Sequence, residues 1–301
     1  MITTRPVDLD PRRPGQRRVG RLIFRGGVSM TADVPELGGL SGLYVGVDGR
    51  FLAVSDHASW IEARLVSDPR TAAPLRFENA RVAGLRDENA ERFYETGLGD
   101  AEALARLPDG RFAVSYERTQ LIRYHALDAD GPFGRSVHGP ALAEADDLEP
   151  NAGLEALAYA GDGRLFVGAE RGEGGAMMWL APVNADAAAA HVARLRAPVG
   201  YGLTGADRLP SGDFVLLQRF YAPVVGVRIR ILRLDGEALA RGEVEAELLA
   251  TLAPPLNLDN FESVSAIPTV DGGARLYLIS DDNFSRTQRT LLYVFDLPPE
   301  E

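Results

Sequence analysis

One β-hairpin is written five times along this chain, and this repetition limits the possible folds more than any other feature. Each copy has a short apolar strand, a turn that contains Asp-Gly or Ser-Gly, and a second strand of alternating character. The copies occupy residues 39–56, 100–117, 153–170, 202–219 and 261–281. Self-similarity at such intervals is typical of repeat architectures.

The repeats predict an all-β fold, a β-propeller of five or six four-stranded blades. Another strand-like segment follows each hairpin, at residues 60–67, 121–127, 176–182, 227–234 and 291–297. Five blades correspond to the visible copies, and the spacers 57–99 and 220–260 leave room for a sixth. Residues 17–30 resemble a strand left over before the first copy, and we expect it to close the ring by pairing into the last blade. We therefore divide the chain into a flexible N-terminal arm (1–17) and a single propeller domain (18–301).

Composition excludes several classes of partner and site. The chain has 32 Lys and Arg residues against 43 Asp and Glu residues, a net charge of −11, which disfavours binding to nucleic acid or anionic membranes. It has no cysteine, which excludes disulfides, thiolate metal sites and a cysteine nucleophile. The sequence contains no run of 18 apolar residues, so it predicts no membrane-spanning helix. We expect a monomer that acts on a small molecule.

The repeat also places polar residues at two equivalent positions. The early position lies seven residues before the first residue of the turn, or nine in the fifth copy, and it holds Ser41, Glu102, Glu155, Thr204 and Glu262. The late position lies eight residues after the same point, or ten in the fifth copy, and it holds Asp56, Glu117, Glu170, Arg219 and Asp281. In a propeller these side chains converge at the mouth of the central channel.

The three early glutamates would form part of a ring of carboxylates. Crowded carboxylates raise one another's pKa unless a cation compensates, and oxygen ligands of this kind suit Ca²⁺. Arg171 and Arg219 offer counter-charge or a clamp for an anion. The same residues also fit a hydrogen-bonded ring of acids and arginines without metal. His57, next to Asp56, is a candidate base or ligand, or a surface residue.

The chain resembles the bacterial phytase-like domain family, the "esterase-like activity of phytase" proteins. The similarity runs through GGLSGL (38–43), GDAEAL (99–104), NAGLEAL (151–157), DNFES (259–263) and SDDNFSRTQRTLL (280–292), and the last two motifs are the most specific. Members are mostly exported, so the resemblance implies a periplasmic or secreted protein. The signal peptide of such proteins is not visible in residues 1–17.

The family name implies a hydrolase of phosphoesters or esters similar to the calcium-dependent propeller phytases. The resemblance then suggests metal ligands at Asp56, Glu102, Glu155, Glu262 and Asp281. It also suggests Arg219 or Arg228 as a phosphate clamp, with Glu117 or Glu170 as the base that activates a metal-bound water. Ser41 and Thr204 depart from a complete ring of acids. Two alternatives remain open: a calcium-dependent lactonase-like propeller, and a non-catalytic periplasmic propeller that binds a ligand or acts as a scaffold.

Overall fold

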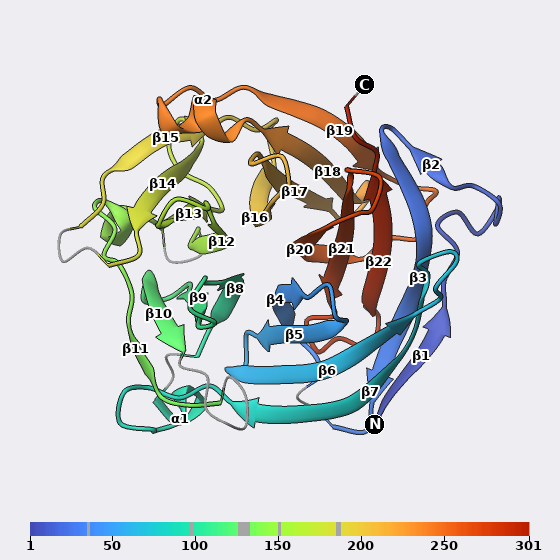
Figure 1. Ribbon diagram of the computed structural model, residues 1–301, viewed down its shortest axis with the longest axis horizontal. Helices are drawn as coiled ribbons and strands as arrows, with labels where there is room; N and C mark the ends of the chain where they lie inside the picture. Colours follow the sequence, from blue (N-terminus) through green and yellow to red (C-terminus); the bar gives the residue numbers. More distant parts are fainter. Residues whose placement is uncertain (35–36, 97–98, 126–132, 150–151, 185–187, 301) are drawn as a thin grey trace.

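The chain folds as a ring of antiparallel β-sheets around a central axis (Figure 1). The computed structural model describes residues 1–34, 37–96, 99–125, 133–149, 152–184 and 188–300. These residues form five sheets, and each sheet contains one copy of the repeated hairpin. The all-β propeller is therefore confirmed, and it has five blades.

In the first four blades the strands follow one another from the axis outward. Blade 1 consists of β4 (Leu40–Val45), β5 (Arg50–Ser55), β6 (Ser59–Ser67) and β7 (Pro74–Gly84). Blade 2 consists of β8 (Ala101–Arg106), β9 (Phe112–Tyr116), β10 (Leu121–His125) and β11 (Ser136–His138). Blade 3 consists of β12 (Leu154–Tyr159), β13 (Arg164–Ala169), β14 (Ala176–Pro182) and β15 (His191–Leu195). Blade 4 consists of β16 (Tyr201–Arg208), β17 (Phe214–Ala222), β18 (Gly226–Leu234) and β19 (Ala246–Leu252). The predicted third strands match β6, β10, β14 and β18, although residues 126 and 127 lie outside the described residues.

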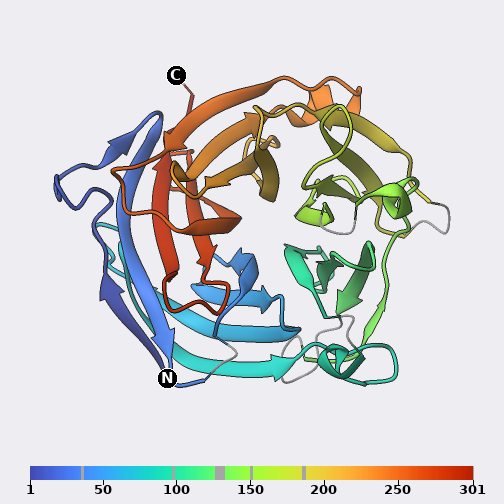
Figure 2. The ribbon, with the colours of Figure 1, turned by 180° about the vertical axis from the view of Figure 1, so that it is seen from behind.

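Blade 5 joins the two ends of the chain. Its inner strands are β20 (Asn260–Pro268), β21 (Ala274–Asp281) and β22 (Thr290–Leu297), and its fourth strand is β3 (Leu22–Ala32). Val28 of β3 lies opposite Leu292 of β22. Figures 1 and 2 show the blue β3 beside the red β22 from both sides. The predicted closure of the ring by an N-terminal strand is confirmed.

The N-terminal residues are more ordered than the expected flexible arm. Strand β1 (Ile2–Pro6) pairs with the outer edge of β3, with Ile2 opposite Ala32. Strand β2 (Arg18–Val19) pairs with the start of β3, and Leu9 is fully buried between blades 4 and 5. The outer edge of β3 offers unpaired backbone groups, and an extended segment satisfies them whatever its side chains.

Helices are few and short in the described part of the chain. They are α1 (Phe93–Thr96), α2 (Gly236–Ala240) and one 3₁₀ turn (Ala145–Asp147). None of these is long and apolar enough to cross a membrane.

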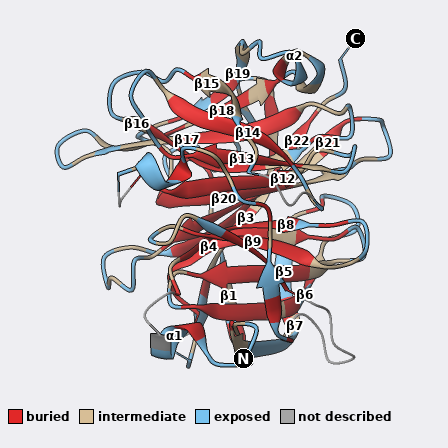
Figure 3. Cartoon of the chain, turned by 90° about the vertical axis from the view of Figure 1, so that its left-hand side faces the viewer, coloured by how far each residue is buried: buried red, intermediate tan, exposed pale blue. Residues whose placement is uncertain are grey.

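The hydrophobic core consists of layers between neighbouring blades. Buried side chains form five clusters, one for each blade interface. Strand β5 shows the origin of this pattern: Phe51 and Ala53 pack toward blade 5, whereas Leu52 and Val54 pack toward blade 2. Because both faces of a blade are covered, buried residues run through the strands, and exposed residues gather in the loops (Figure 3).

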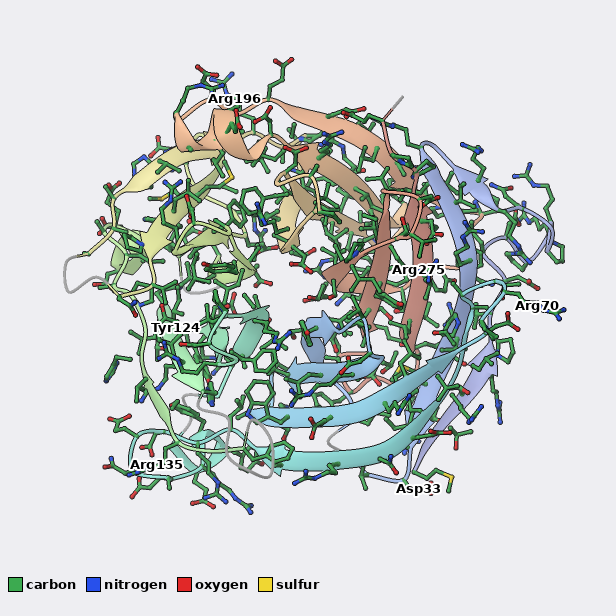
Figure 4. All side chains as sticks on the ribbon, viewed as in Figure 1. Asp33, Arg70, Tyr124, Arg135, Arg196 and Arg275 are labelled. Atoms are coloured by element: carbon green, nitrogen blue, oxygen red, sulfur yellow. The ribbon has the colours of Figure 1, made fainter. Side chains whose placement is uncertain are left out.

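The innermost strands β4, β8, β12, β16 and β20 each contact both neighbours around the axis. Blade 5 is also hydrogen-bonded to blade 1, since Ser263 Oγ accepts from Leu43 N at 3.1 Å. Farther out, Tyr124 Oη donates to the carbonyl oxygen of Val183 across the interface of blades 2 and 3 (Figure 4). The labelled Arg70, Arg135 and Arg196 project from the outer rim. Contacts and hydrogen bonds between neighbouring blades therefore fix the inner strands around the axis.

Candidate functional site

Every inner strand carries a β-bulge at the early position of the repeat. The register of each inner pair shifts at Leu40/Gly42, Ala101/Leu104, Leu154/Ala156, Leu203/Gly205 and Phe261/Ser263. The residues within these shifts include Ser41, Glu102, Glu155, Thr204 and Glu262. A bulge inserts one residue without a partner and redirects its side chain. The repeat therefore turns its early residues out of the regular alternation of the strand.

Three of these residues bring their carboxylates together. Glu102, Glu155 and Glu262 each offer an oxygen within 4.8 Å of the others, and they are 7, 8 and 8% exposed. Glu262 is held by Arg219 Nη1 at 3.2 Å and by Asn260 Nδ2, which donates to its Oε1 at 2.5 Å. Within the described part of the chain, no hydrogen bond reaches the carboxylates of Glu102 or Glu155. Burial, followed by mutual repulsion, raises the pKa of both well above the usual range.

The late residues complete a pocket at the channel mouth. It encloses about 270 Å³ and is lined by Ser41, Asp56, Asp100, Glu102, Glu117, Glu155, Glu170, Arg171, Arg219, Glu262, Asp281 and Asn283. All five predicted metal ligands lie here, together with both predicted acid bases. Thr204 is buried beside them, but its Oγ1 faces the carbonyl oxygen of Phe261 at 3.5 Å and does not line the pocket.

Glycines beside the late acids explain how these side chains fit. A Cβ atom on Gly153 would lie 2.3 Å from Cγ of Glu117, and one on Gly202 would lie 2.5 Å from Oε1 of Glu170. Each glycine stands two residues before an early position. In the second copy that place belongs to Asp100, whose carboxylate joins Glu102 and Glu117 in a second close group. Asp100 was not predicted, although its replacement of the repeat's glycine is a signal that the sequence carries.

The predicted arginines divide into two kinds. Arg171 donates twice to Oε2 of Glu170, at 3.0 and 2.6 Å, and Arg219 contacts Glu262, so both lie in the pocket. Arg228 does not line it. This residue is on β18 opposite Phe220, the neighbour of Arg219. Because successive strand residues alternate faces and directly opposed residues share one, Arg228 lies on the other face of blade 4 from Arg219.

Three further carboxyls of this pocket also have raised pKa values. Burial, with repulsion from Asp100 and Glu262, raises the pKa of Asp56 to about 7. Burial and repulsion from Glu262 raise that of Asp281 to about 8. Burial and the charge of Asp100 likewise raise the pKa of Glu117. Oδ1 of Asp56 is buried and receives no hydrogen bond from the described residues.

These observations fit a hard cation. The candidate metal-binding atoms are all oxygens, Arg171 and Arg219 form ion pairs with Glu170 and Glu262, and Glu102, Glu155 and Oδ1 of Asp56 accept no hydrogen bond from the described residues. Carboxylate oxygens in such a cage are the ligands that Ca²⁺ takes in flexible geometry. A hydrogen-bonded ring of acids and arginines accounts for Glu170 and Glu262 but leaves Glu102 and Glu155 unexplained.

His57 lies beside this pocket, not in it. It follows Asp56 and, with Asp56 and Asp100, lines a neighbouring pocket of about 280 Å³. Its ring stacks on Phe284 with centroids 4.0 Å apart. Asp282, the next acid after Asp281, holds the loop around Phe284: its Oδ1 accepts from Phe284 N at 3.0 Å and from Gly39 N at 3.2 Å.

Comparison with known proteins gives a family match and several similar folds. The model of the Phytase-like family, described as "Esterase-like activity of phytase", matches residues 35–284. Among solved structures, the chain is similar to PQQ-bound aldose sugar dehydrogenase from Streptomyces coelicolor, with 11% identity, 98% of each chain covered and a TM-score of 0.46. It is similar to a luciferin-regenerating enzyme at 15% identity, with 97% of this chain and 95% of that one covered and a TM-score of 0.44. Virginiamycin B lyase from Staphylococcus aureus has 9% identity, 99 and 100% coverage and a TM-score of 0.42.

Proposed function

Since this chain belongs to the Phytase-like family, we propose that it is a calcium-assisted hydrolase of ester or phosphoester bonds that works at the acidic channel mouth. One observation carries the proposal: Glu102 and Glu155 are buried beside Glu262 without a hydrogen bond from the described residues. Buried charges without partners are costly, and a bound cation removes that cost.

The residues that would hold the ion are Glu102, Glu155 and Glu262, together with Asp56 and Asp281, which line the same pocket. A bound Ca²⁺ would polarise an oxygen of the substrate and lower the pKa of a coordinated water. The five carboxylates come from four blades, so the ring has to be closed before the site exists.

Glu117 is the best-placed base. Glu170 is tied to Arg171, whereas Glu117 lines the pocket and burial raises its pKa, which makes it a stronger base than an ordinary carboxylate. Arg171 and Arg219 are positioned to attract an anionic group such as a phosphate. Arg228, on the other face of blade 4, has no role in this scheme, and His57 lies outside the acidic pocket.

Family membership also supports a periplasmic or secreted location. Extracellular modules bind calcium with Kd of about 10⁻⁴–10⁻³ M, a range that works where the ion is plentiful. Fractionation of the native host, with detection of the protein outside the cytoplasm, tests this part of the proposal.

The main experiment is calorimetric titration of EDTA-treated protein with CaCl₂, followed by assays on 4-nitrophenyl phosphate, phytate, 4-nitrophenyl acetate and gluconolactone. We expect calcium uptake and calcium-dependent turnover of an ester or phosphoester. Glu155→Gln should weaken calcium binding at least tenfold, whereas Glu247→Gln, an exposed partner of Arg21, should not change it.

Three outcomes contradict the proposal in different ways. Turnover of gluconolactone but of no other substrate would support the alternative hypothesis of a lactonase. Calcium uptake without turnover of any substrate would support a binding protein. Absence of both calcium uptake and turnover rejects the metal site itself.

A further inference from the structure

A second pocket opens directly beside the acidic mouth. It is lined by Asp56, His57, Ala58, Tyr94, Gly99, Asp100 and Arg118, and it encloses about 280 Å³. Asp56 and Asp100 form part of both pockets, so they are the shared wall. A ligand with one group at the carboxylates therefore has room for its remainder here.

Two aromatic rings, those of His57 and Tyr94, line this pocket, and a third, that of Phe284, stacks on His57 from outside it. His57 follows β5, Tyr94 lies on α1 and Phe284 follows β21. The rings of His57 and Phe284 are parallel within 15°, and the Tyr94 ring centroid lies 6.4 Å from that of His57. Tyr94 is 71% and Phe284 40% exposed, which is unusual for large apolar rings beside a charged site.

The position of Phe284 is held against backbone strain. Asn283 and Phe284 have φ angles of +47° and +49°, a left-handed conformation that bulky residues rarely adopt. Asp281 Oδ1 accepts from Asn283 N at 2.7 Å, and Asp282 Oδ1 accepts from Phe284 N at 3.0 Å. Strain that the surroundings overdetermine in this way is typical of ligand clamps.

The floor under Phe284 is built from the glycine pair at the start of the first repeat. A Cβ atom on Gly38 would lie 2.8 Å from the Phe284 ring, and one on Gly39 would lie 2.5 Å from it. Because the two glycines have no side chains, the aromatic ring of Phe284 in blade 5 can pack closely against the loop that precedes blade 1. The GGLSGL and SDDNF motifs thus meet at one place.

A cation completes the pocket. Nε of Arg118 lies 2.6 Å from Oδ2 of Asp100, and the Arg118 side chain is 72% exposed. This ion pair orients the guanidinium, and its other N–H groups can donate to an acceptor on a ligand.

We propose that this pocket recognises a flat ring carried by the substrate, which packs against Tyr94 and His57, with Phe284 stacked on His57 to hold it in place, while the ester or phosphoester group reaches the acidic mouth. The proposal rests on the proposed function for what lies at the carboxylates, but the ring pocket stands on its own geometry. Flat rings favour offset or edge-to-face packing on aromatic side chains, a geometry that saturated rings of the same size do not reproduce. The volume, near the lower end for ligand sites at about 300 Å³, suits one ring and its substituents.

The test compares phenyl phosphate with cyclohexyl phosphate, which has the same carbon count but no flat face. Both are titrated calorimetrically into the full-length protein, once with 5 mM CaCl₂ and once with EDTA, at up to about 20 mM ligand. We expect phenyl phosphate to bind about three- to tenfold more tightly in calcium, a gain in the range of aromatic pairs. Phe284→Leu and Tyr94→Leu should each reduce this preference to less than twofold. Tyr221→Leu is the matched control, because this exposed tyrosine lines neither pocket.

The outcomes separate this proposal from the proposed function. A preference for phenyl phosphate that both pocket variants remove supports the ring site, even where calcium uptake and turnover are absent. Equal binding of the two ligands overturns it, as does a preference that survives in both variants, or no binding of phenyl phosphate with or without calcium. Tyr94 is exposed on α1, so its variant keeps the test valid where Phe284→Leu fails to fold.

Discussion

Glu102, Glu155 and Glu262 place three carboxylates within 4.8 Å of one another in buried surroundings. Without a cation such a group keeps its protons, because repulsion and desolvation both oppose ionisation. A cation would allow it to ionise. If the proposed calcium site exists, calcium binding should therefore release protons into the buffer.

Replacing one of these acids should have opposite effects with and without metal. In EDTA at pH 8, Glu155→Gln removes a carboxyl group that folding forces either to take up a proton or to stay charged beside Glu102 and Glu262. We expect its Tm to rise by about 2–4 °C, the change that about 1 kcal/mol makes in a large domain. In excess CaCl₂ the variant should be less stable than the wild type, because it loses the stabilisation that binding provides. Differential scanning fluorimetry under both conditions checks the reversal, and a lower Tm in EDTA would contradict it.

The metal-free protein should lose stability as the pH rises. Asp56 and Asp281 have pKa values raised from 3.8 to about 7 and about 8, so between pH 4 and 8 the folded state holds more protons than the unfolded state. The free energy of unfolding then falls as pH increases through this window. Urea titrations in EDTA from pH 5 to 9 measure the fall, and 5 mM CaCl₂ should flatten it. A free energy that rises with pH in EDTA is the opposite result.

At the scale of elements, small polar side chains link the inner strands of neighbouring blades. Ser115 of β9 is fully buried: it donates to the carbonyl oxygen of Leu154 at 2.6 Å and accepts from Ala103 N at 3.1 Å. It therefore couples blade 2 to blade 3 next to the bulges that carry Glu102 and Glu155. The geometry of the site depends on such links as well as on the acids themselves.

Removing that link should destabilise the propeller without touching an acid. Ser115→Ala leaves one donor and one acceptor without a partner in a buried place, which costs about 1–3 kcal/mol. Urea unfolding should show this loss. Ser211→Ala, in an exposed turn of blade 4, should change stability by less than about 0.5 kcal/mol. Equal effects of the two substitutions would show that the link to Leu154 is not stabilising.

The hairpins and third strands could be predicted from the sequence because alternation and Asp-Gly turns are local signals. Strand β1 could not, since its pairing depends on an edge of β3 that only the closed ring creates. Of the two arginines predicted as alternative phosphate clamps, Arg219 lines the pocket and Arg228 does not, and the sequence could not separate them for a similar reason. Arg228 is close to Arg219 in the sequence, but this does not reveal which face of β18 it occupies. The register between β17 and β18 determines the face.

The early and late positions predicted which acids converge, but not how each is held. Asp100 was not predicted because three other copies of the repeat have glycine at the equivalent position. The difference becomes visible only when the inner strands are aligned. The depth of burial, and hence the raised pKa values, depends on side chains from other blades and is not readable from one strand.

At the scale of the whole molecule, the ring is a closed set of five apolar interfaces, and its seam lies between β3 and β22. Asp296 lies opposite Ile23, so the end of β22 is adjacent to the start of β3. A circular permutant that starts at Leu37, joins Leu297 to Leu22 through Asn-Gly and ends at Asp33 keeps every blade. Two-residue Asn-Gly turns match antiparallel strands in this register.

We expect this permutant to fold as a monomer and to keep its calcium affinity within about threefold, with a lower Tm because β1 and Leu9 are lost. Deletion of residues 1–32 should instead leave β22 as an open edge and cause aggregation. Size-exclusion chromatography and calcium calorimetry distinguish the two forms. A soluble, calcium-binding deletion variant would show that the seam is dispensable.

The seam also sets an order of events during synthesis. Strand β3 is made before blades 1 to 4, and β22, its partner, is made after them. Blades 1 to 4 are contiguous and can form while translation continues, whereas β3 lacks its partner until β22 is made. Such distant pairing is slow and prone to aggregation. The ring therefore cannot close until β22 has been made, however early the other blades form.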